Sequence, residues 1–347
     1  MPAEARRVRV MQSFRAIRPT TNPYIAMLDA ALAASPELVH LRFSWRRALF
    51  GAYDAIHFHW PETLLGGAHW WTSLAKRGLF TLLVLRLALG RIAVVRTLHN
   101  LALPEGIGWW QRALLTRVLR QTTLQITLNA STPVRDGRPS VLIPHGHYRD
   151  WFADLPREEP VPGRLAFVGL IRRYKGVEDL LAAFTGLQPT APGASLEIGG
   201  MPSSPELRRM LLDAAEANPS IVVHPSFLAD RELVEIVTRA ELVVLPYRMM
   251  HNSGTTLAAL SLDRPVLVPD NAVNRALSEE VGDGWVHLFA ATLTPAALAA
   301  ATAAVRAPRS QRPTLADREW TEVAERHAEA YHRAVAFRRS PSAARLR

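Results

Sequence analysis

The chain has 347 residues, of which 48% are hydrophobic and 21% are charged, a composition that indicates a soluble globular protein of two domains. It contains no cysteine, which excludes disulfide frameworks, thiol nucleophiles and cysteine-based metal sites. A formal net charge of +10 favours an anionic partner: nucleic acid, an anionic membrane surface or a phosphorylated substrate. The basic residues are scattered and carry no DNA- or RNA-binding motif, so we expect no nucleic-acid partner.

Short apolar strands alternate with helices in the first half of the chain. The strands are predicted at residues 7–14, 38–45, 55–60, 92–99, 124–129 and 140–146, with the clearest helices at 22–34 and 110–121. This alternation is typical of a parallel, doubly wound α/β sheet. The N-terminal residues lack the apolar core of a secretory signal, and together with the absence of cysteine they predict a cytoplasmic protein.

The most apolar window runs from Gly78 to Val95, and aromatic and basic residues lie just upstream of it in residues 69–90, HWWTSLAKRGLFTLLVLRLALG. Arg86 and Arg91 interrupt the apolar run short of the roughly 20 residues that span a bilayer. Two interpretations remain open. The segment is either a helix packed on its own sheet or an amphipathic element that holds the protein peripherally at the inner face of the cell membrane.

A second alternating series follows residues 151–163, which are rich in proline and charge and indicate a linker. Strands are predicted at 164–171, 195–200, 220–227, 241–248 and 264–269, and helices at 177–187, 205–217 and 230–240. Residues 294–307 are Ala-rich and of low complexity, and residues 316–339 predict a long polar helix. We expect domains at 1–155 and 156–310 and a helical segment at 311–347.

Three cations follow the first strand of the second domain. In FVGLIRRYKG, a turn at Gly169 precedes Arg172, Arg173 and Lys175. Ligands of doubly wound sheets bind at the carboxyl ends of the strands, so this loop is a candidate site for a diphosphate. An ordinary basic surface loop is the alternative.

A polar loop follows a later strand of the same sheet, directly before a helix. It consists of Asn252, Ser253, Gly254, Thr255 and Thr256. Backbone N–H groups at a helix N-terminus attract anions, which predicts a phosphate site, whereas Ser and Thr are also ordinary N-cap residues. Tyr247 and Arg248 precede this loop and are expected at the same edge.

The segments FVGLIRRYKGVEDLLAAF, LEIGGMP, LVVLPYR and NSGTTLAALSLDRPVLVP resemble the donor domain of GT-B glycosyltransferases, which use nucleotide-sugars. The resemblance implies two Rossmann-like domains facing a cleft, with a C-terminal helix packing back. Lys175 matches the lysine that contacts the donor diphosphate in such enzymes. Leu170 stands where an arginine is usual, so Arg172 or Arg173 would have to replace it.

Two segments of the first domain, DAIHFHWPE and VVRTLHNLALPE, resemble bacterial GDP-mannose-dependent β-mannosyltransferases of xanthan-type exopolysaccharide assembly. This implies inverting transfer of mannose from GDP-mannose to a saccharide acceptor linked to a lipid. The large retaining families carry two Glu residues around the loop that here contains no acid between His251 and Leu262. A retaining GT-B enzyme with another nucleotide-sugar and a non-catalytic nucleotide-sugar-binding protein remain as alternatives.

Inverting transfer needs a general base and positive charge for the leaving nucleoside diphosphate. No metal ion is required if cationic side chains supply this positive charge. The candidates for the base lie at strand ends of the first domain, and Glu62, Glu105 and His59 are the catalytic residues we predict. His57 and His99 are further candidates at the same ends, and His145 in IPHG is expected to line the cleft.

Overall fold

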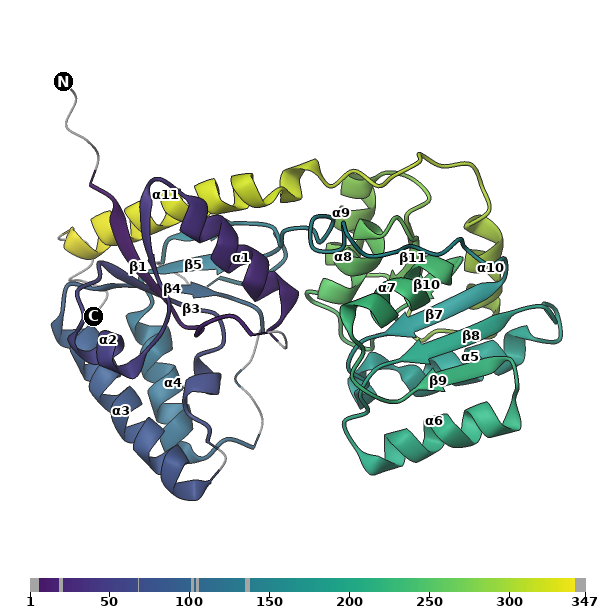
Figure 1. Cartoon of the computed structure of the whole chain (residues 1–347), viewed down its shortest axis with the longest axis horizontal. Coiled ribbons are helices and arrows are strands. Elements are labelled where there is room, and N and C mark those ends of the chain that lie inside the picture. Colours follow the sequence, from purple (N-terminus) through teal and green to yellow (C-terminus); the bar gives the residue numbers. More distant parts are fainter. Residues whose placement is uncertain are drawn as a thin grey trace. The chain divides into compact units, whose positions relative to one another are not determined.

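The computed structural model describes residues 6–18, 21–67, 69–100, 103, 106–134 and 138–340. They form two compact units. Unit 1 comprises the residues up to Gly146 together with those from Asp317 onwards, and unit 2 is His147–Ala316. Each unit is built on a six-stranded sheet in which all paired strands are parallel (Figure 1). The predicted α/β class with two doubly wound domains is therefore confirmed.

The sheet of unit 1 has the strand order β2-β1-β3-β4-β5-β6. Its strands are β1 Val8–Gln12, β2 Leu38–Leu41, β3 Ala55–Phe58, β4 Ala93–Thr97, β5 Leu124–Thr127 and β6 Ser140–Leu142. The order changes direction between β1 and β3, because the chain first adds β2 on one side and then the remaining strands on the other. Ligands of such sheets bind at the carboxyl ends of the strands beside this switch point.

Helices cover both faces of this sheet. They are α1 Pro23–Ala34, α2 Trp45–Phe50, the 3₁₀ turn η1 Pro61–Leu64, α3 Trp70–Leu89, α4 Trp109–Gln121 and α11 Trp320–Arg339. The C-terminal α11 contacts α1 and the strands β1, β3 and β4, so it completes unit 1 although it comes last in the chain (Figure 1). Helix α3 packs against both α2 and α4 in the same unit.

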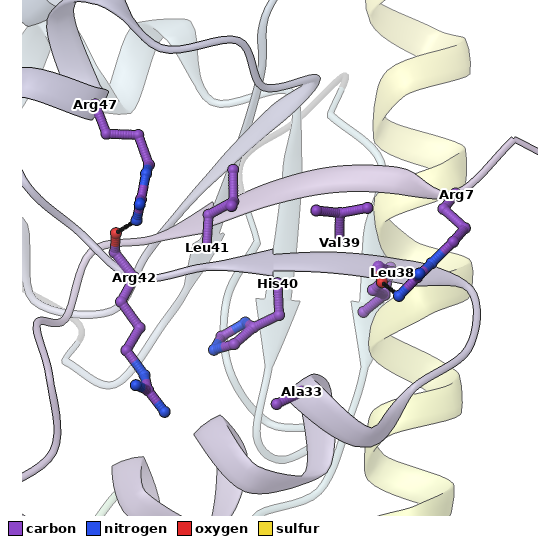
Figure 2. A pocket seen from close by; sticks show the side chains of 8 residues that line it. All are labelled: Arg7, Ala33, Leu38, Val39, His40, Leu41, Arg42 and Arg47. Carbon is purple, nitrogen blue, oxygen red and sulfur yellow. Dashed lines mark hydrogen bonds between the residues drawn. The ribbon is translucent and has the colours of Figure 1, made fainter.

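Arginine side chains protect the exposed edge of strand β2. The Arg7 guanidinium donates to the carbonyl oxygen of Leu38, and Arg47 donates to that of Arg42 over 2.9 Å. Both groups line an open pocket of about 480 Å³ along this strand (Figure 2). Because an unpaired strand edge otherwise offers its carbonyls to another chain, these contacts oppose edge-to-edge association.

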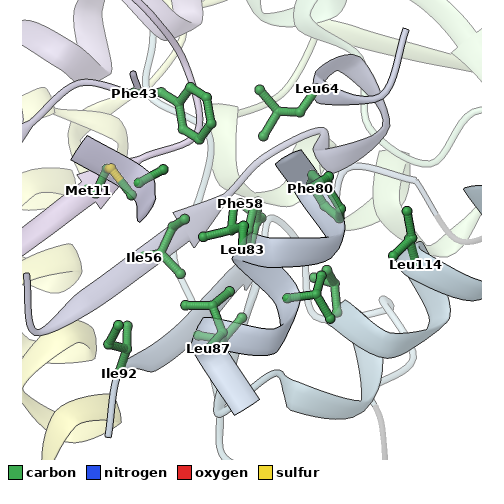
Figure 3. Close-up of a cluster of buried hydrophobic side chains, with 14 of the residues drawn as sticks. Met11, Phe43, Ile56, Phe58, Leu64, Phe80, Leu83, Leu87, Ile92 and Leu114 are labelled. Carbon is green, nitrogen blue, oxygen red and sulfur yellow. The ribbon is translucent and has the colours of Figure 1, made fainter. Parts of the chain in front are cut away.

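The core of unit 1 lies between its sheet and α3. Ile56 and Phe58 of β3 pack against Phe80, Leu83 and Leu87 of α3, all of which are buried (Figure 3). The spacing of these helix residues places them on one face. The interpretation of this segment as a helix packed on its own sheet is correct for that face.

The other face of α3 stays in solvent. Trp70 is 74% exposed and Leu89 is 87% exposed, and Trp71, Leu82 and Leu85 are also exposed. Within the part of the chain that the structure describes, no helix is both long enough and apolar enough to cross a membrane.

The sheet of unit 2 has the order β12-β11-β10-β7-β8-β9, with its switch point between β7 and β10. Its strands are β7 Arg164–Val168, β8 Ser195–Gly199, β9 Ile221–His224, β10 Leu242–Val244, β11 Val266–Pro269 and β12 Val286–Phe289. Its helices are η2 Arg173–Lys175, α5 Val177–Leu187, α6 Pro205–Ala217, α7 Asp230–Arg239, α8 Gly254–Ser261, α9 Ala272–Val281 and α10 Pro295–Ala304. A short 3₁₀ turn, η3 Ala316–Arg318, joins the two units.

Besides the short 3₁₀ turn η2, the elements α9, β12 and α10 of unit 2 were not predicted. The Ala-rich run of α10 has no polar periodicity, yet it forms a regular helix that packs on α5. Gly186 makes this packing possible, since a Cβ at that position would lie 2.5 Å from Pro295. Small side chains at a close helix–helix contact explain the low complexity of the sequence.

The division of the chain also differs from the expected one. The segment predicted as a linker packs onto unit 2, where Trp151 Nε1 donates to Asp230 over 2.9 Å and the backbone N–H of Glu158 donates to Thr238 over 2.9 Å. The first boundary therefore lies after Gly146 instead of residue 155. Similarly, the returning chain joins unit 1 from Asp317 instead of residue 311.

We predict that Phe80→Ala lowers the free energy of unfolding by about 3–5 kcal/mol, because it leaves a cavity between α3 and the sheet. Leu89→Ala, in the same helix but exposed, is the matched control and should change it by less than about 0.5 kcal/mol. Urea titration of both variants measures the difference. Equal stability of the two variants would contradict the packing of α3 on this sheet.

Candidate active site

Two loops meet at the switch point of unit 2, one after β7 and the other after β10. Gly169, the first residue after β7, has a φ of 109°, a conformation that favours glycine. A Cβ at this position would lie 3.3 Å from Thr255 Oγ1 and 3.5 Å from Lys175 Nζ. An ammonium and a hydroxyl from separate loops are thus brought together over one glycine.

Lys175 is a buried cation at this edge. Its Nζ lies 4.8 Å from the centre of the Tyr247 ring, a favourable cation–π contact. Burial lowers the pKa of the Lys175 ammonium, and the nearby charge of Arg172 lowers it further. Burial also raises the pKa of Tyr247 to about 12, an effect that the hydroxyls of Thr255 and Ser253 partly offset. An incoming anion would compensate the desolvated charge of Lys175.

The two loops are fixed to each other by further contacts. Arg248 forms a two-pronged ion pair with Asp179 of α5, with distances of 2.9 and 3.0 Å, and its backbone N–H donates to the carbonyl of Tyr174. Gly176 has a φ of 66°, and a Cβ there would overlap the carbonyl oxygen of Pro246. Arg248 is therefore bound to protein groups, whereas Lys175 is held with its ammonium toward the loop junction.

The other two predicted cations are placed differently. Arg172 and Arg173 are exposed, and neither makes an ion pair or a side-chain hydrogen bond to another described residue. Leu170, at the position where an arginine was expected from the resemblance, is 51% exposed. The structure therefore leaves both arginine side chains available to a ligand at the solvent side of the loop after β7.

The loop of small polar residues begins α8. Ser253 is the N-cap: its Oγ accepts from the backbone N–H of Thr256 over 3.2 Å. Gly254 is the first helical residue, and the Thr256 side chain is buried beneath the turn. Asn252 precedes the cap and is partly buried. The N-cap interpretation is confirmed, and the first helical N–H groups lie in the same turn as Thr255.

Imidazole and aromatic rings gather at the carboxyl edge of the sheet in unit 1. His57 on β3 is fully buried, and both of its ring nitrogens are engaged, Nδ1 with the Tyr331 hydroxyl and Nε2 with Thr97 Oγ1, each over 2.8 Å. His59 is 3% exposed and lies 3.3 Å from His99 through Nδ1 and 3.2 Å from Gln12 through Nε2. Neither His57 nor His59 keeps a ring nitrogen for a ligand.

His99 lies at the outer side of this cluster and is only partly buried. Its ring stacks on Trp60 with 4.0 Å between ring centres, and the edge of Tyr24 packs against it at 5.5 Å. His145 packs on Tyr24 at 4.3 Å and donates from Nδ1 to the carbonyl of Gly146. Burial lowers the pKa of His145 to about 4 and that of His59 to about 3.

Glu62 lies in η1, directly after β3 and beside Arg96 of β4. Burial raises the pKa of the Glu62 carboxyl, while a backbone hydrogen bond and the Arg96 charge act in the opposite direction. The predicted catalytic residue Glu105 lies outside the residues that the structure describes. Among the described residues, no three His, Asp or Glu side chains are grouped as a metal site would require.

Comparison with known proteins places the chain among glycosyltransferases. Residues 162–307 match the family model "Glycosyl transferases group 1". GDP-mannose:glycolipid 4-β-D-mannosyltransferase of Xanthomonas campestris pv. campestris is 43% identical over 335 residues, which cover 96% of this chain and 94% of that protein. The chain belongs to this β-mannosyltransferase family. A glycogen synthase of Mycobacterium tuberculosis is 27% identical over 72% of this chain.

Solved structures identify the fold of the glycosyltransferase as GT-B. Sucrose-phosphate synthase from Thermosynechococcus elongatus matches with a TM-score of 0.58 and 16% identity, covering 96% of each chain. HepE from Anabaena, in complex with UDP and glucose, matches with a TM-score of 0.61 and 12% identity, covering 95% of this chain and 97% of that one. At these identities, the matches bear on the fold alone.

We predict that Ser253→Ala costs about 1 kcal/mol of the stability of unit 2, because it removes the side-chain acceptor at the start of α8. Ser253→Asp, which retains an acceptor, should keep most of that stability. Thermal unfolding of the three proteins makes the comparison. An unchanged melting temperature in Ser253→Ala would show that the cap does not contribute.

Proposed function

We propose that this glycosyltransferase transfers mannose from GDP-mannose to a saccharide acceptor carried by a lipid. The observation that supports it is the junction at Gly169, where the buried Lys175 ammonium and the Thr255 hydroxyl come together at the switch point of unit 2. The 43% identical relative is named for the same donor and for a glycolipid acceptor. GDP-mannose carries its sugar through an α bond, so a β-linked product requires inversion.

The cations and the start of α8 would stabilise the leaving group. As the bond between mannose and GDP breaks, negative charge grows on the diphosphate. Lys175 would hold this charge at the loop junction, Arg172 and Arg173 would approach it from solvent, and the N–H groups at the start of α8 would donate to it. Tyr247, Asn252, Ser253, Gly254, Thr255 and Thr256 would shape this part of the site. With this positive charge we expect transfer to continue in the presence of EDTA.

We predict that Lys175→Ala weakens GDP binding by about 1.5–3 kcal/mol, because it removes a charge-assisted hydrogen bond. Lys76→Ala, the other lysine of the chain, lies in unit 1 and serves as the matched control with unchanged affinity. Gly254→Val should stay folded and also lose most of its donor binding, since a branched side chain would crowd the phosphate. Calorimetric titration with GDP measures all three.

Turnover then separates the remaining alternatives. Transfer of labelled mannose with a β linkage, read by NMR of the product, supports the inverting enzyme, and an α linkage would favour a retaining one. GDP binding without any transfer would favour the non-catalytic alternative. Wild-type GDP affinity in both Lys175→Ala and Gly254→Val would remove the proposed donor site.

We infer that unit 1 also binds an anionic membrane surface peripherally, at the inner face of the cell membrane. The solvent face of α3 carries Trp70, Trp71, Leu82, Leu85 and Leu89, and large apolar side chains are exposed on its neighbours α2, at Phe50, and α4, at Trp109. Lys76 and Arg77 follow the two tryptophans. Aromatic and basic residues of this kind favour the lipid headgroup region, where a glycolipid acceptor would lie.

We predict that vesicles containing anionic lipid carry the wild-type protein to the top of a flotation gradient at low salt. The double variant Trp70→Ser, Trp71→Ser should remain at the bottom. Phe227→Ser removes an exposed aromatic ring of unit 2 and is the control that should still float. Wild-type protein that remains with the soluble fraction at low salt would refute the membrane surface.

A further inference from the structure

A continuous chain of hydrogen bonds, buried except at His99, crosses the carboxyl edge of the sheet in unit 1. It runs from His99 Nε2 to His59 Nδ1 over 3.3 Å and from His59 Nε2 to Gln12 Oε1 over 3.2 Å. Gln12 Nε2 then bonds to the Tyr331 hydroxyl over 3.0 Å, and that hydroxyl lies 2.8 Å from His57. Residues from three strand ends and from α11 therefore form one network.

The contacts of Gln12 set the direction of this network. Gln12 donates through Nε2 to Tyr331, and its Oε1 can only accept, so the proton of the His59 ring lies on Nε2. The Nδ1 of neutral His59 then accepts, which requires His99 to donate from Nε2. Neutral His99 consequently carries its lone pair on Nδ1, and no described residue binds that nitrogen.

We propose that His99 Nδ1 is the general base of the transfer reaction, held in this tautomer by the positioning residues His59, Gln12 and Tyr331. This inference rests on the proposed function. It gives the predicted site residue His59 an indirect role. The His59 ring is almost completely buried and both of its nitrogens are occupied, so it cannot contact the acceptor substrate. Of the two rings, His99 is the one with partial exposure.

The proposed step balances without another reactant. The acceptor hydroxyl gives its proton to His99 Nδ1 as its oxygen forms the bond to C1 of the sugar. The bond from C1 to the phosphate oxygen breaks, and its electron pair leaves with GDP. The imidazolium keeps its Nε2–H bond to His59 and afterwards releases the Nδ1 proton to water.

The surroundings of His99 keep its base form at neutral pH. Burial lowers the pKa of His99 well below its ordinary value, and charge on His59, His145 or Arg96 lowers it further. The rings of Trp60 and Tyr24 contact it from η1 and α1 without adding charge at neutral pH. Because the base must be unprotonated, kcat/KM should fall only at pH values below those at which an ordinary histidine titrates.

The decisive variant is His99→Gln, which keeps a polar side chain but cannot accept the proton. We expect its kcat for mannose transfer to fall by about 10²–10⁴-fold. Its affinity for GDP should stay at the wild-type value, because that site lies in unit 2. Glu62→Gln is the matched variant for the rival base, and a fall in kcat confined to it would assign the proton acceptor to Glu62 instead.

Tyr331→Phe tests the positioning chain, since it removes only the hydroxyl that joins Gln12 to His57. We expect a lower kcat, an unchanged KM for GDP-mannose and a displaced acidic limb of the pH profile, whereas a purely structural role would leave the limb in place. His99→Gln with wild-type kcat, or a loss confined to Glu62→Gln, overturns the inference. A wild-type protein that transfers no mannose would instead refute the proposed function.

Discussion

The donor site proposed for this protein depends on the close approach of two loops at one glycine. Parallel strands bring the loops after β7 and β10 to the same edge. The φ of 109° at Gly169 favours glycine, and Lys175 and Thr255 lie close over its backbone. The contacts of Gly176 with Pro246 and of Arg248 with Asp179 then hold this arrangement. A phosphate would find its donors already placed, which avoids the entropic cost of ordering them on binding.

At the carboxyl edges of both sheets, polar groups are buried without partners that fully offset the cost of their desolvation. In unit 2, the ammonium of Lys175 is desolvated against the face of Tyr247 instead of being paired with a carboxylate. In unit 1, burial holds several imidazoles in their neutral form, so that the tautomer of each ring is set by its neighbours. Such groups reduce the stability of an empty protein, and their retention at strand ends indicates a role in binding or proton transfer.

The sequence allowed every strand except β12, most helices and the class of the fold to be predicted, because apolar runs between turn residues have a clear period. Prediction from the sequence failed where side-chain packing, and not the hydrophobic pattern, determines the structure. The alanines of α10 give no periodic signal, and their helix is apparent only from its close packing on Gly186. Charge and proline suggested a free linker, yet Trp151 and Glu158 find partners on unit 2. For the proposed donor site, the spacing of residues indicated Lys175 and the cap at Ser253. It could not show that Arg248 is already paired with Asp179.

The role of the histidines could not be read from the sequence because it depends on residues far apart in the chain. His57 and His59 follow the period of a strand, and nothing local separates them from His99. What separates them is Gln12 at the end of the first strand and Tyr331 near the C-terminus, which occupy the inner nitrogens through the return of α11 to unit 1. The last helix thereby supplies the hydroxyl that ends this network inside unit 1. In the proposed mechanism, Tyr331 would act on the chemistry of His99 without touching it, although more than 200 positions separate the two residues.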